Sequence, residues 1–156
     1  MPTHKPSWRL EAEQEREIQS VRAALFIDQL AERRPVAVVV AGDMDARPDS
    51  ASMRFWTGRQ SLAGNSVAYQ DAWEFSNPSD PGLTFTTDNP LVTSDWRRIS
   101  GRRIDYILLR CPNHAPAAAT IASCRRLFDE PTHGTWASDH FGLTCDLSAA
   151  APDLPS

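Results

Sequence analysis

Three short acidic motifs, each at the edge of an apolar run, are the residues of this sequence best suited to chemistry. In the first, Asp43 and Asp45 follow a valine-rich run, and in the second, Asp105 begins an apolar run. In the third, Asp139 and His140 stand directly before the last apolar run of the chain. Carboxylates at strand ends, with a histidine among them, are suited to metal-assisted phosphoryl transfer. Each motif alone is common, so it is their joint presence that indicates a phosphoesterase site.

Asp43 and Asp45 are the first candidate pair, because two carboxylates two residues apart on an extended chain point to the same side. Like charges at such a distance repel each other, so the pair favours a cation or a proton between them. The alternative is structural: a polar turn after a strand, with Asp45 or Asp49 capping the helix that follows. A Gly-Asp-x-Asp motif without further support favours this structural role.

The same motif resembles the start of haloacid-dehalogenase-type phosphatases, in which an apolar strand ends in Asp-x-Asp. That resemblance implies Asp43 as a nucleophile and Asp45 as an acid or base. The family usually continues with Gly-Thr or a similar pair, whereas Ala46 and Arg47 follow here. It also needs a later lysine, whereas Lys5 is the only lysine of this chain. We therefore rank this interpretation below the metal-dependent one.

Asp105 lies in an apolar segment, where an unpaired carboxylate is costly to bury. A structural partner would be Arg102 or Arg103, which stand just before it. A functional partner would be His140, whose tautomer a carboxylate can fix. The Asp139–His140 pair is by itself typical of a turn, and it becomes a functional candidate together with the other two motifs.

The segments around these motifs predict a layered α/β (α+β) domain. The expected elements are helices at 8–34 and about 50–62, and strands at 36–41, 82–86, 104–109, 117–122 and 141–147. The first helix has an expected apolar stripe made of Ile18, Val21, Leu25 and Leu30. The run 36–41 has the composition of a strand buried on both faces.

Length, charge and cysteines bound the function further. The chain has 156 residues, enough for one domain with a sizeable core, and a net charge of -4. That charge does not indicate a broad basic surface for nucleic acid. Cys111, Cys124 and Cys145 lack metal-type spacing and cannot all pair, which predicts a reduced, cytoplasmic setting. We expect no membrane span, because no apolar run approaches the required length.

The order of the three motifs resembles the endonuclease/exonuclease/phosphatase superfamily, whose fold is similar to that of pancreatic deoxyribonuclease. The C-terminal half of that family carries Gly-Asp-x-Asn, then Arg-Ile-Asp-Tyr, then Ser-Asp-His, and this chain has a counterpart of each. A weaker match places His4 in the family's Thr-His-Leu segment. The resemblance implies a domain over 1–148, a frayed tail over 149–156, and one half of a four-layer α/β/β/α sandwich. That half would hold one sheet and its outer helices.

The resemblance also implies roles for the candidate residues. Asp43 would position or deprotonate the attacking water, and Asp105 would orient His140, which contacts or protonates the phosphate. Asp139 would be a metal ligand, and His4 would hydrogen-bond the phosphate from the other side. The implied cofactor is Mg²⁺ or Mn²⁺, because the ligands are hard oxygens. The implied substrate is a phosphate mono- or diester of unknown identity.

Two departures from the family pattern shape the expectations. Asp45 stands where the family usually has Asn, and an ionised Asp cannot donate a hydrogen bond to phosphate. With Asp43 and Asp139, it would instead strengthen cation binding. The family's first half normally supplies an Asn and a metal-binding Glu. We therefore expect the chain to be a truncated or incomplete domain, which needs a partner chain or self-associates through an uncovered sheet face, and which has little activity alone.

Overall fold

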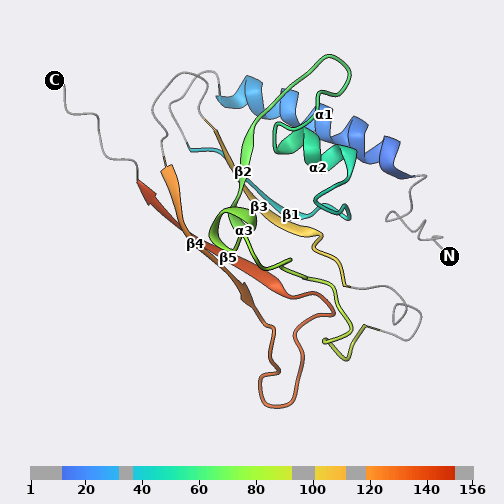
Figure 1. Cartoon of the computed structure of the whole chain (residues 1–156), viewed down its shortest axis with the longest axis vertical. Helices are drawn as coiled ribbons and strands as arrows, with labels where there is room; N and C mark the ends of the chain where they lie inside the picture. Colours follow the sequence, from blue (N-terminus) through green and yellow to red (C-terminus); the bar gives the residue numbers. More distant parts are fainter. Residues whose placement is uncertain (1–11, 32–36, 93–100, 112–118, 150–156) are drawn as a thin grey trace.

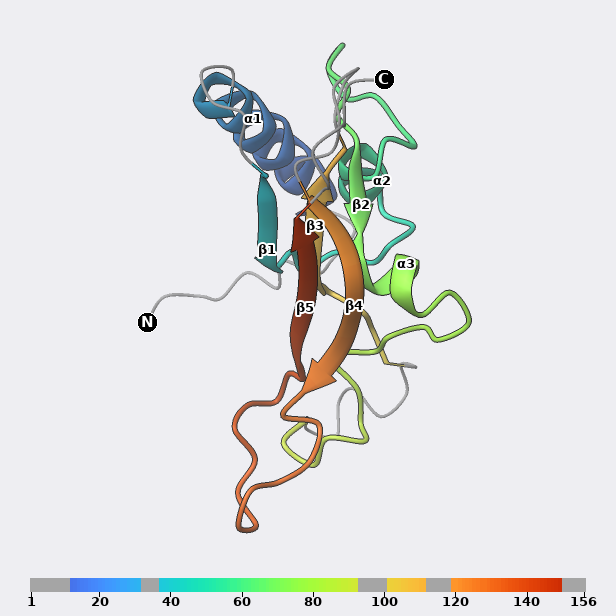
Figure 2. The ribbon, with the colours of Figure 1, turned by 90° about the vertical axis from the view of Figure 1, so that its left-hand side faces the viewer.

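The computed structural model describes residues 12–31, 37–92, 101–111 and 119–149. Its elements are α1 (Glu13–Ala31), β1 (Val39–Asp43), α2 (Ala51–Trp56), β2 (Tyr69–Asp71), α3 (Ala72–Ser76), β3 (Asp105–Arg110), β4 (Ala119–Leu127) and β5 (Gly142–Ala149). They form three layers: α1 and α2, then a three-stranded sheet, then the β4–β5 hairpin (Figure 1, Figure 2). The predicted α/β class is confirmed. None of the described helices is long and apolar enough to cross a membrane.

β3 is the central strand of the three-stranded sheet, whose order is β1-β3-β2 with antiparallel neighbours. Because side chains alternate along a strand, β3 contributes to two cores. Tyr106 and Leu108 point toward α1 and α2, and Ile107 and Leu109 point toward the hairpin. Asp105 belongs to the second set by this alternation, so it faces the space between the sheet and the hairpin.

The first core lies between the helices and the sheet. Its fully buried members include Met53 and Phe55 of α2, together with Tyr106 and Leu108 of β3. The hydroxyl of Tyr106 donates a hydrogen bond of 2.7 Å to the Ala46 carbonyl. This bond ties the turn after β1 to β3, so the core also fixes the segment that follows Asp43.

The second core lies between the sheet and the β4–β5 hairpin and corrects one expectation. Ile121 and Cys124 of β4 are buried against Trp73 and Leu109, with Leu143 of β5 packed beside them. The inner face of the sheet is therefore covered in part by the chain's own hairpin. The resemblance implied a fragment with one sheet and an uncovered face, whereas two facing sheets are present.

The predicted apolar stripe of α1 is confirmed at Val21, which packs against the first core, and is wrong at its other three positions. Ile18, Leu25 and Leu30 are 45%, 45% and 62% exposed, whereas Ala24 is buried. The face that packs on α2 and the sheet is polar around Ala24: the carboxylate of Glu13 accepts a bond from Ser52 N. Two further contacts on this face are Ser20 with Trp56 and Asp28 with Arg110. The docking face thus combines three apolar residues, Val21, Ala24 and Ile27, with polar contacts, so its apolar period differs from the predicted stripe.

β1 is also less buried than its composition predicts. It pairs with β3 on one side, and Val39, Ala41 and Asp43 are exposed. Val40 packs against the first core. The prediction of burial on both faces is wrong because β1 is an edge strand, and the hairpin does not extend over it. The second helix is shorter than predicted, Ala51–Trp56, and is capped by Ser50 as expected.

Candidate active site

The antiparallel register between β1 and β3 brings two of the predicted carboxylates together. Asp43, the last residue of β1, stands directly opposite Asp105, the first residue of β3. Residues directly opposite each other in an antiparallel pair have side chains on the same face, with Cβ atoms about 4.5–5.5 Å apart. Both carboxylates therefore lie on the face of the sheet that looks toward the hairpin.

His140 reaches the same point from the segment that leads into β5. Its Nδ1 lies 3.0 Å from Asp105 Oδ2, and because a carboxylate only accepts, Nδ1 carries the proton. One ligand atom from each of Asp43, Asp105 and His140 lies within 4.8 Å of the others. Three segments that are far apart in sequence thus meet at one place. Asp105 pairs with His140 and not with the neighbouring arginines.

The electrostatics of this cluster favour a protonated histidine. The hydrogen bond that His140 donates to Asp105 is the largest cause that raises the pKa of His140 above its ordinary value. Burial acts in the opposite direction, and the charges of Asp105, Asp43 and Asp139 add to the rise. Asp139, although exposed, is therefore near enough to act on the imidazole. The imidazolium is more populated near neutral pH than for a free histidine.

The neighbours of Asp43 are mainly other carboxylates, which disfavour its charged form. Burial of its carboxyl raises its pKa, and Asp105 and Asp45 raise it further. The Asp45 N–H, which donates to Asp43 Oδ1 over 2.8 Å, and the His140 charge lower it. The result is a carboxylate with a higher pKa than usual, which is a better proton acceptor than an ordinary aspartate.

Asp45 does not join the cluster formed by Asp43, Asp105 and His140. It has a left-handed backbone conformation with φ of 45°, so the extended geometry assumed for Asp43 and Asp45 ends at β1. Its charge acts on Arg102, whose pKa burial lowers and Asp45 raises. A metal-ligand role for Asp45 or Asp139 stays a prediction, because the described cluster contains neither of them. His4 lies outside the described residues.

Arg102 and Arg103, which precede Asp105, are buried, whereas arginines in a solvated loop would be exposed. Arg103 forms an ion pair with Asp71, and the side chains of both are at most 6% exposed. The Arg102 guanidinium lies over the ring of Phe85 at 5.1 Å. The Phe85 ring also borders the site, because its centroid is 5.0 Å from that of the His140 ring. Sequence reasoning missed Phe85, because nothing in its spacing marks a contact to a histidine.

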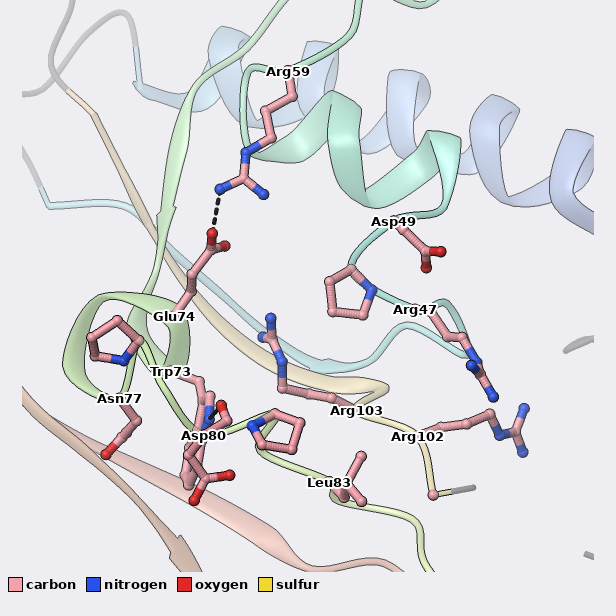
Figure 3. A pocket seen from close by; sticks show the side chains of 14 residues that line it. Arg47, Asp49, Arg59, Trp73, Glu74, Asn77, Asp80, Leu83, Arg102 and Arg103 are labelled. Atoms are coloured by element: carbon pink, nitrogen blue, oxygen red, sulfur yellow. Dashed lines mark hydrogen bonds and ion pairs between the residues drawn. The ribbon is translucent and has the colours of Figure 1, made fainter. Parts of the chain in front are cut away.

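A cavity of about 330 Å³ opens beside these arginines, between the segment that leads into β3, α3 and the loop before α2 (Figure 3). Arg59 and Glu74 form an ion pair on one side of it, and Trp73 lies against Asp80. Arg47 and Arg102 lie close together on the side away from α3 (Figure 3). The cavity wall contains none of the three clustered groups, so it adjoins the candidate site without including it.

The donor set fits a hard divalent cation. Asp43 and Asp105 offer carboxylate oxygens on one face of the sheet, within 4.8 Å of a His140 ring nitrogen, and the protonated imidazole leaves metal binding to the two carboxylates. Mg²⁺ is bound through one or two carboxylates and keeps several waters, which two carboxylates on an open surface allow. Mn²⁺ accepts the same oxygens, so the residues present fit either ion.

A family model for the Endonuclease/Exonuclease/phosphatase family matches residues 4–140. The chain belongs to this family. The match covers the segments that carry Asp43, Asp105 and His140, and it favours the metal-dependent interpretation over a haloacid-dehalogenase-type phosphatase. As their name says, the family's members include endonucleases, exonucleases and phosphatases, which are hydrolases of phosphate ester bonds. A comparison with curated proteins found no match.

Solved structures of family members have a similar fold. One is D. rerio TDP2 in complex with a single-strand DNA product, with 26% identity and a TM-score of 0.63, covering 90% of this chain and 52% of that one. Another is an endonuclease/exonuclease/phosphatase from Bacteroides vulgatus, with 18% identity and a TM-score of 0.60, covering 88% and 45%. A truncated C. elegans TDP2 has 16% identity and a TM-score of 0.61, covering 92% and 51%. The chain thus spans about half the length of these structures.

Proposed function

We propose that this chain forms the Asp43–Asp105–His140 part of a metal-dependent phosphoesterase site, which hydrolyses a phosphate mono- or diester. The observation that carries the proposal is the convergence of these three groups within 4.8 Å. Their roles as site residues are supported by chemistry as well as by position. One carboxylate has a raised pKa, and the other holds the proton of a histidine.

The proposed mechanism gives each of the three groups a role in proton transfer or in charge neutralisation. Asp43 accepts a proton from the attacking water, which its raised pKa favours. Asp105 holds Nδ1 of His140, so that Nε2 is the nitrogen that faces the substrate and donates to a phosphate oxygen. The protonated imidazole offsets the negative charge that develops on the phosphoryl group.

A bound Mg²⁺ or Mn²⁺ would be held by Asp43 and Asp105, and would supply neutralisation of phosphate charge. We keep Asp139 as an additional ligand by prediction. The sequence also predicts Asp45 as a ligand, but Asp45 lies outside the cluster and has a left-handed backbone, so we expect it to act on the ion through its charge alone. Asp45 places a carboxylate where the family pattern has an amide. An ionised carboxylate, unlike an amide, cannot donate a hydrogen bond to phosphate. The charges of Asp45 and Asp43 raise the pKa of Arg102, so the Arg102 guanidinium offsets part of their negative charge.

We further propose that a second polypeptide segment completes the domain. The support is the open strand edges: in the described residues β1 pairs with β3 alone, and β5 with β4 alone. Val39 on β1 and Leu147 on β5 are 43% and 40% exposed, and the two strands are outermost on the same side of the molecule (Figure 2). Exposed edges of this kind add strands readily. The segment would correspond to the half of the matched structures that this chain does not cover, and self-association is the alternative.

The test is turnover of bis(4-nitrophenyl) phosphate and of 4-nitrophenyl phosphate with Mg²⁺ or Mn²⁺. The chain is assayed alone and with a polypeptide covering the remaining part of the D. rerio TDP2 chain. We expect little turnover alone and metal-dependent turnover after complementation, lost in His140→Gln and kept in Asp129→Asn, an exposed aspartate paired with Arg126. Turnover by the complemented chain that His140→Gln leaves intact would refute the proposed site.

The proposal also concerns the natural substrate and the cellular location. The D. rerio structure contains single-strand DNA, so a single-stranded oligonucleotide is the first natural phosphodiester to assay. The acidic net charge of -4 gives no separate support for nucleic acid. The three cysteines are free thiols, which supports the cytoplasmic location predicted from their spacing.

A further inference from the structure

Thr84 is a fully buried polar residue that lies between the two segments of the proposed site. It is 0% exposed, and its hydroxyl oxygen accepts hydrogen bonds from two backbone amides, Ile104 N at 3.2 Å and Asp105 N at 3.3 Å. Its carbonyl accepts a bond of 2.7 Å from Phe141 N. One residue therefore contacts the backbone of Asp105 and the backbone next to His140.

These contacts fall where the two strands begin. β3 begins at Asp105 and β5 at Gly142, and the segment between residues 83 and 92 belongs to neither strand. Thr84 N and Phe85 N also donate to the Arg102 carbonyl, each over 2.9 Å. Since a buried N–H without a partner is costly, the hydroxyl of Thr84 has a defined task at the Asp105 amide.

A second residue of the 83–92 segment, Asn89, contacts the chain on the other side of His140. We call residues 138–141 the histidine loop. Asn89 is 0% exposed, and its side-chain amide donates to the Ser138 carbonyl over 2.8 Å. Ser138 in turn accepts from the His140 amide at its hydroxyl over 3.1 Å. The histidine loop is thus attached to the 83–92 segment on both sides of His140, by Asn89 before it and by Thr84 after it.

We propose that Thr84 is a positioning residue, which sets the distance between Asp105 and His140 by fixing the backbones of both. The inference rests on the proposed function for its catalytic meaning, but the geometry it describes can be measured without turnover. Thr84 contacts no reacting atom, so its effect is on how well the histidine proton is held. Asn89 assists by holding the loop at Ser138.

The test compares Thr84→Val, which keeps the shape and removes the hydroxyl, with Thr84→Ser, which keeps the hydroxyl. Thr86→Val is the matched control, because Thr86 is a buried threonine of the same segment whose hydroxyl contacts Asp88. The readout is the downfield NMR resonance of the proton between His140 Nδ1 and Asp105, at one fixed, mildly acidic pH. Asp105→Asn provides the reference spectrum without the carboxylate.

We expect exchange of this proton with water to be about tenfold faster in Thr84→Val, as for the loss of one buried hydrogen-bond partner. The resonance should also move toward the Asp105→Asn position. Thr84→Ser and Thr86→Val should keep the wild-type spectrum. If Thr84→Val does not fold, Thr84→Ala is compared with Thr84→Ser in the same way, because water can then reach the two amides.

The outcomes separate this inference from the proposed function. A folded Thr84→Val with the wild-type resonance and exchange rate would overturn the positioning role, whatever the activity of the complemented chain. A lost resonance in Thr84→Val, with no hydrolysis by the complemented wild type, would support the positioning role and refute the proposed function. In an active complemented protein, the positioning role further requires a lower kcat with an unchanged KM in Thr84→Val.

Discussion

The Asp105–His140 hydrogen bond should contribute measurably to stability, in a way that depends on pH. Its atoms are 3.0 Å apart, and the side chains of His140 and Asp105 are 26% and 20% exposed. A hydrogen bond to a charged group contributes about 1.5–3 kcal/mol, and partial exposure places this one near the lower end, at about 1.5 kcal/mol. The measurement is a double-mutant cycle with Asp105→Asn and His140→Gln, using denaturant unfolding of the metal-free chain.

The sign of the pH dependence follows from the histidine. Asp105 raises the pKa of folded His140 above its unfolded value, so the folded state holds the proton more tightly. The charged part of the coupling is fully present below the unfolded pKa, about 6.5, and is lost as pH rises through the folded pKa. The neutral imidazole still donates, so about half of the coupling should remain at high pH.

A control pair tests whether the measured dependence is specific. Arg59 and Glu74 form an ion pair whose side chains are 52% and 43% exposed. Exposed pairs contribute about 0–1 kcal/mol, and this pair contains no histidine. An Asp105–His140 coupling as small as that of the control pair, or one that does not change between mildly acidic and alkaline pH, would refute the reasoning.

Three further results are expected. Asp71→Asn should lower the free energy of unfolding by about 3–5 kcal/mol in denaturant titrations, because it leaves the Arg103 guanidinium buried without its charged partner. Asp43→Asn should weaken Mn²⁺ binding at least about tenfold by isothermal titration calorimetry, since it removes one of two clustered carboxylates; equal affinity would place the ion elsewhere. Asp45→Asn should change Mn²⁺ affinity by less than about threefold, because Asp45 lies outside that cluster, whereas a loss matching that of Asp43→Asn would make it a ligand.

The parts of the site that could be predicted are those that local chemistry determines. An aspartate in an apolar strand needs a partner, and a histidine before another strand is suited to be that partner. Asp105 and His140 do pair. The choice between His140 and the adjacent arginines required the fold, because it is Asp71, on another strand, that takes Arg103.

The parts that could not be predicted depend on packing between distant segments. The exposure of β1 follows from its place at the sheet edge, which a run of valines does not reveal. α1 docks through Val21, Ala24 and Ile27 together with polar contacts such as Glu13 with Ser52, whereas its larger apolar residues Leu25, Phe26 and Leu30 are exposed, so hydrophobicity alone is a poor guide to its buried face. Thr84 is one of several threonines in a segment without helix or strand, and only its contacts distinguish it.

The charge balance of the site explains why these positions belong together. Asp43 and Asp105 stand opposite each other, with Asp45 and Asp139 close enough to act on their neighbours. Against these four carboxylates, the positive charges that the pKa directions bring into play are Arg102, the neighbouring Arg47 and a protonated His140. Such an excess of negative charge destabilises the folded chain unless a cation or a proton offsets it. A divalent cation that binds only the folded state would therefore stabilise that state. The repulsion among the carboxylates, which destabilises the metal-free chain, would then favour binding of the cation.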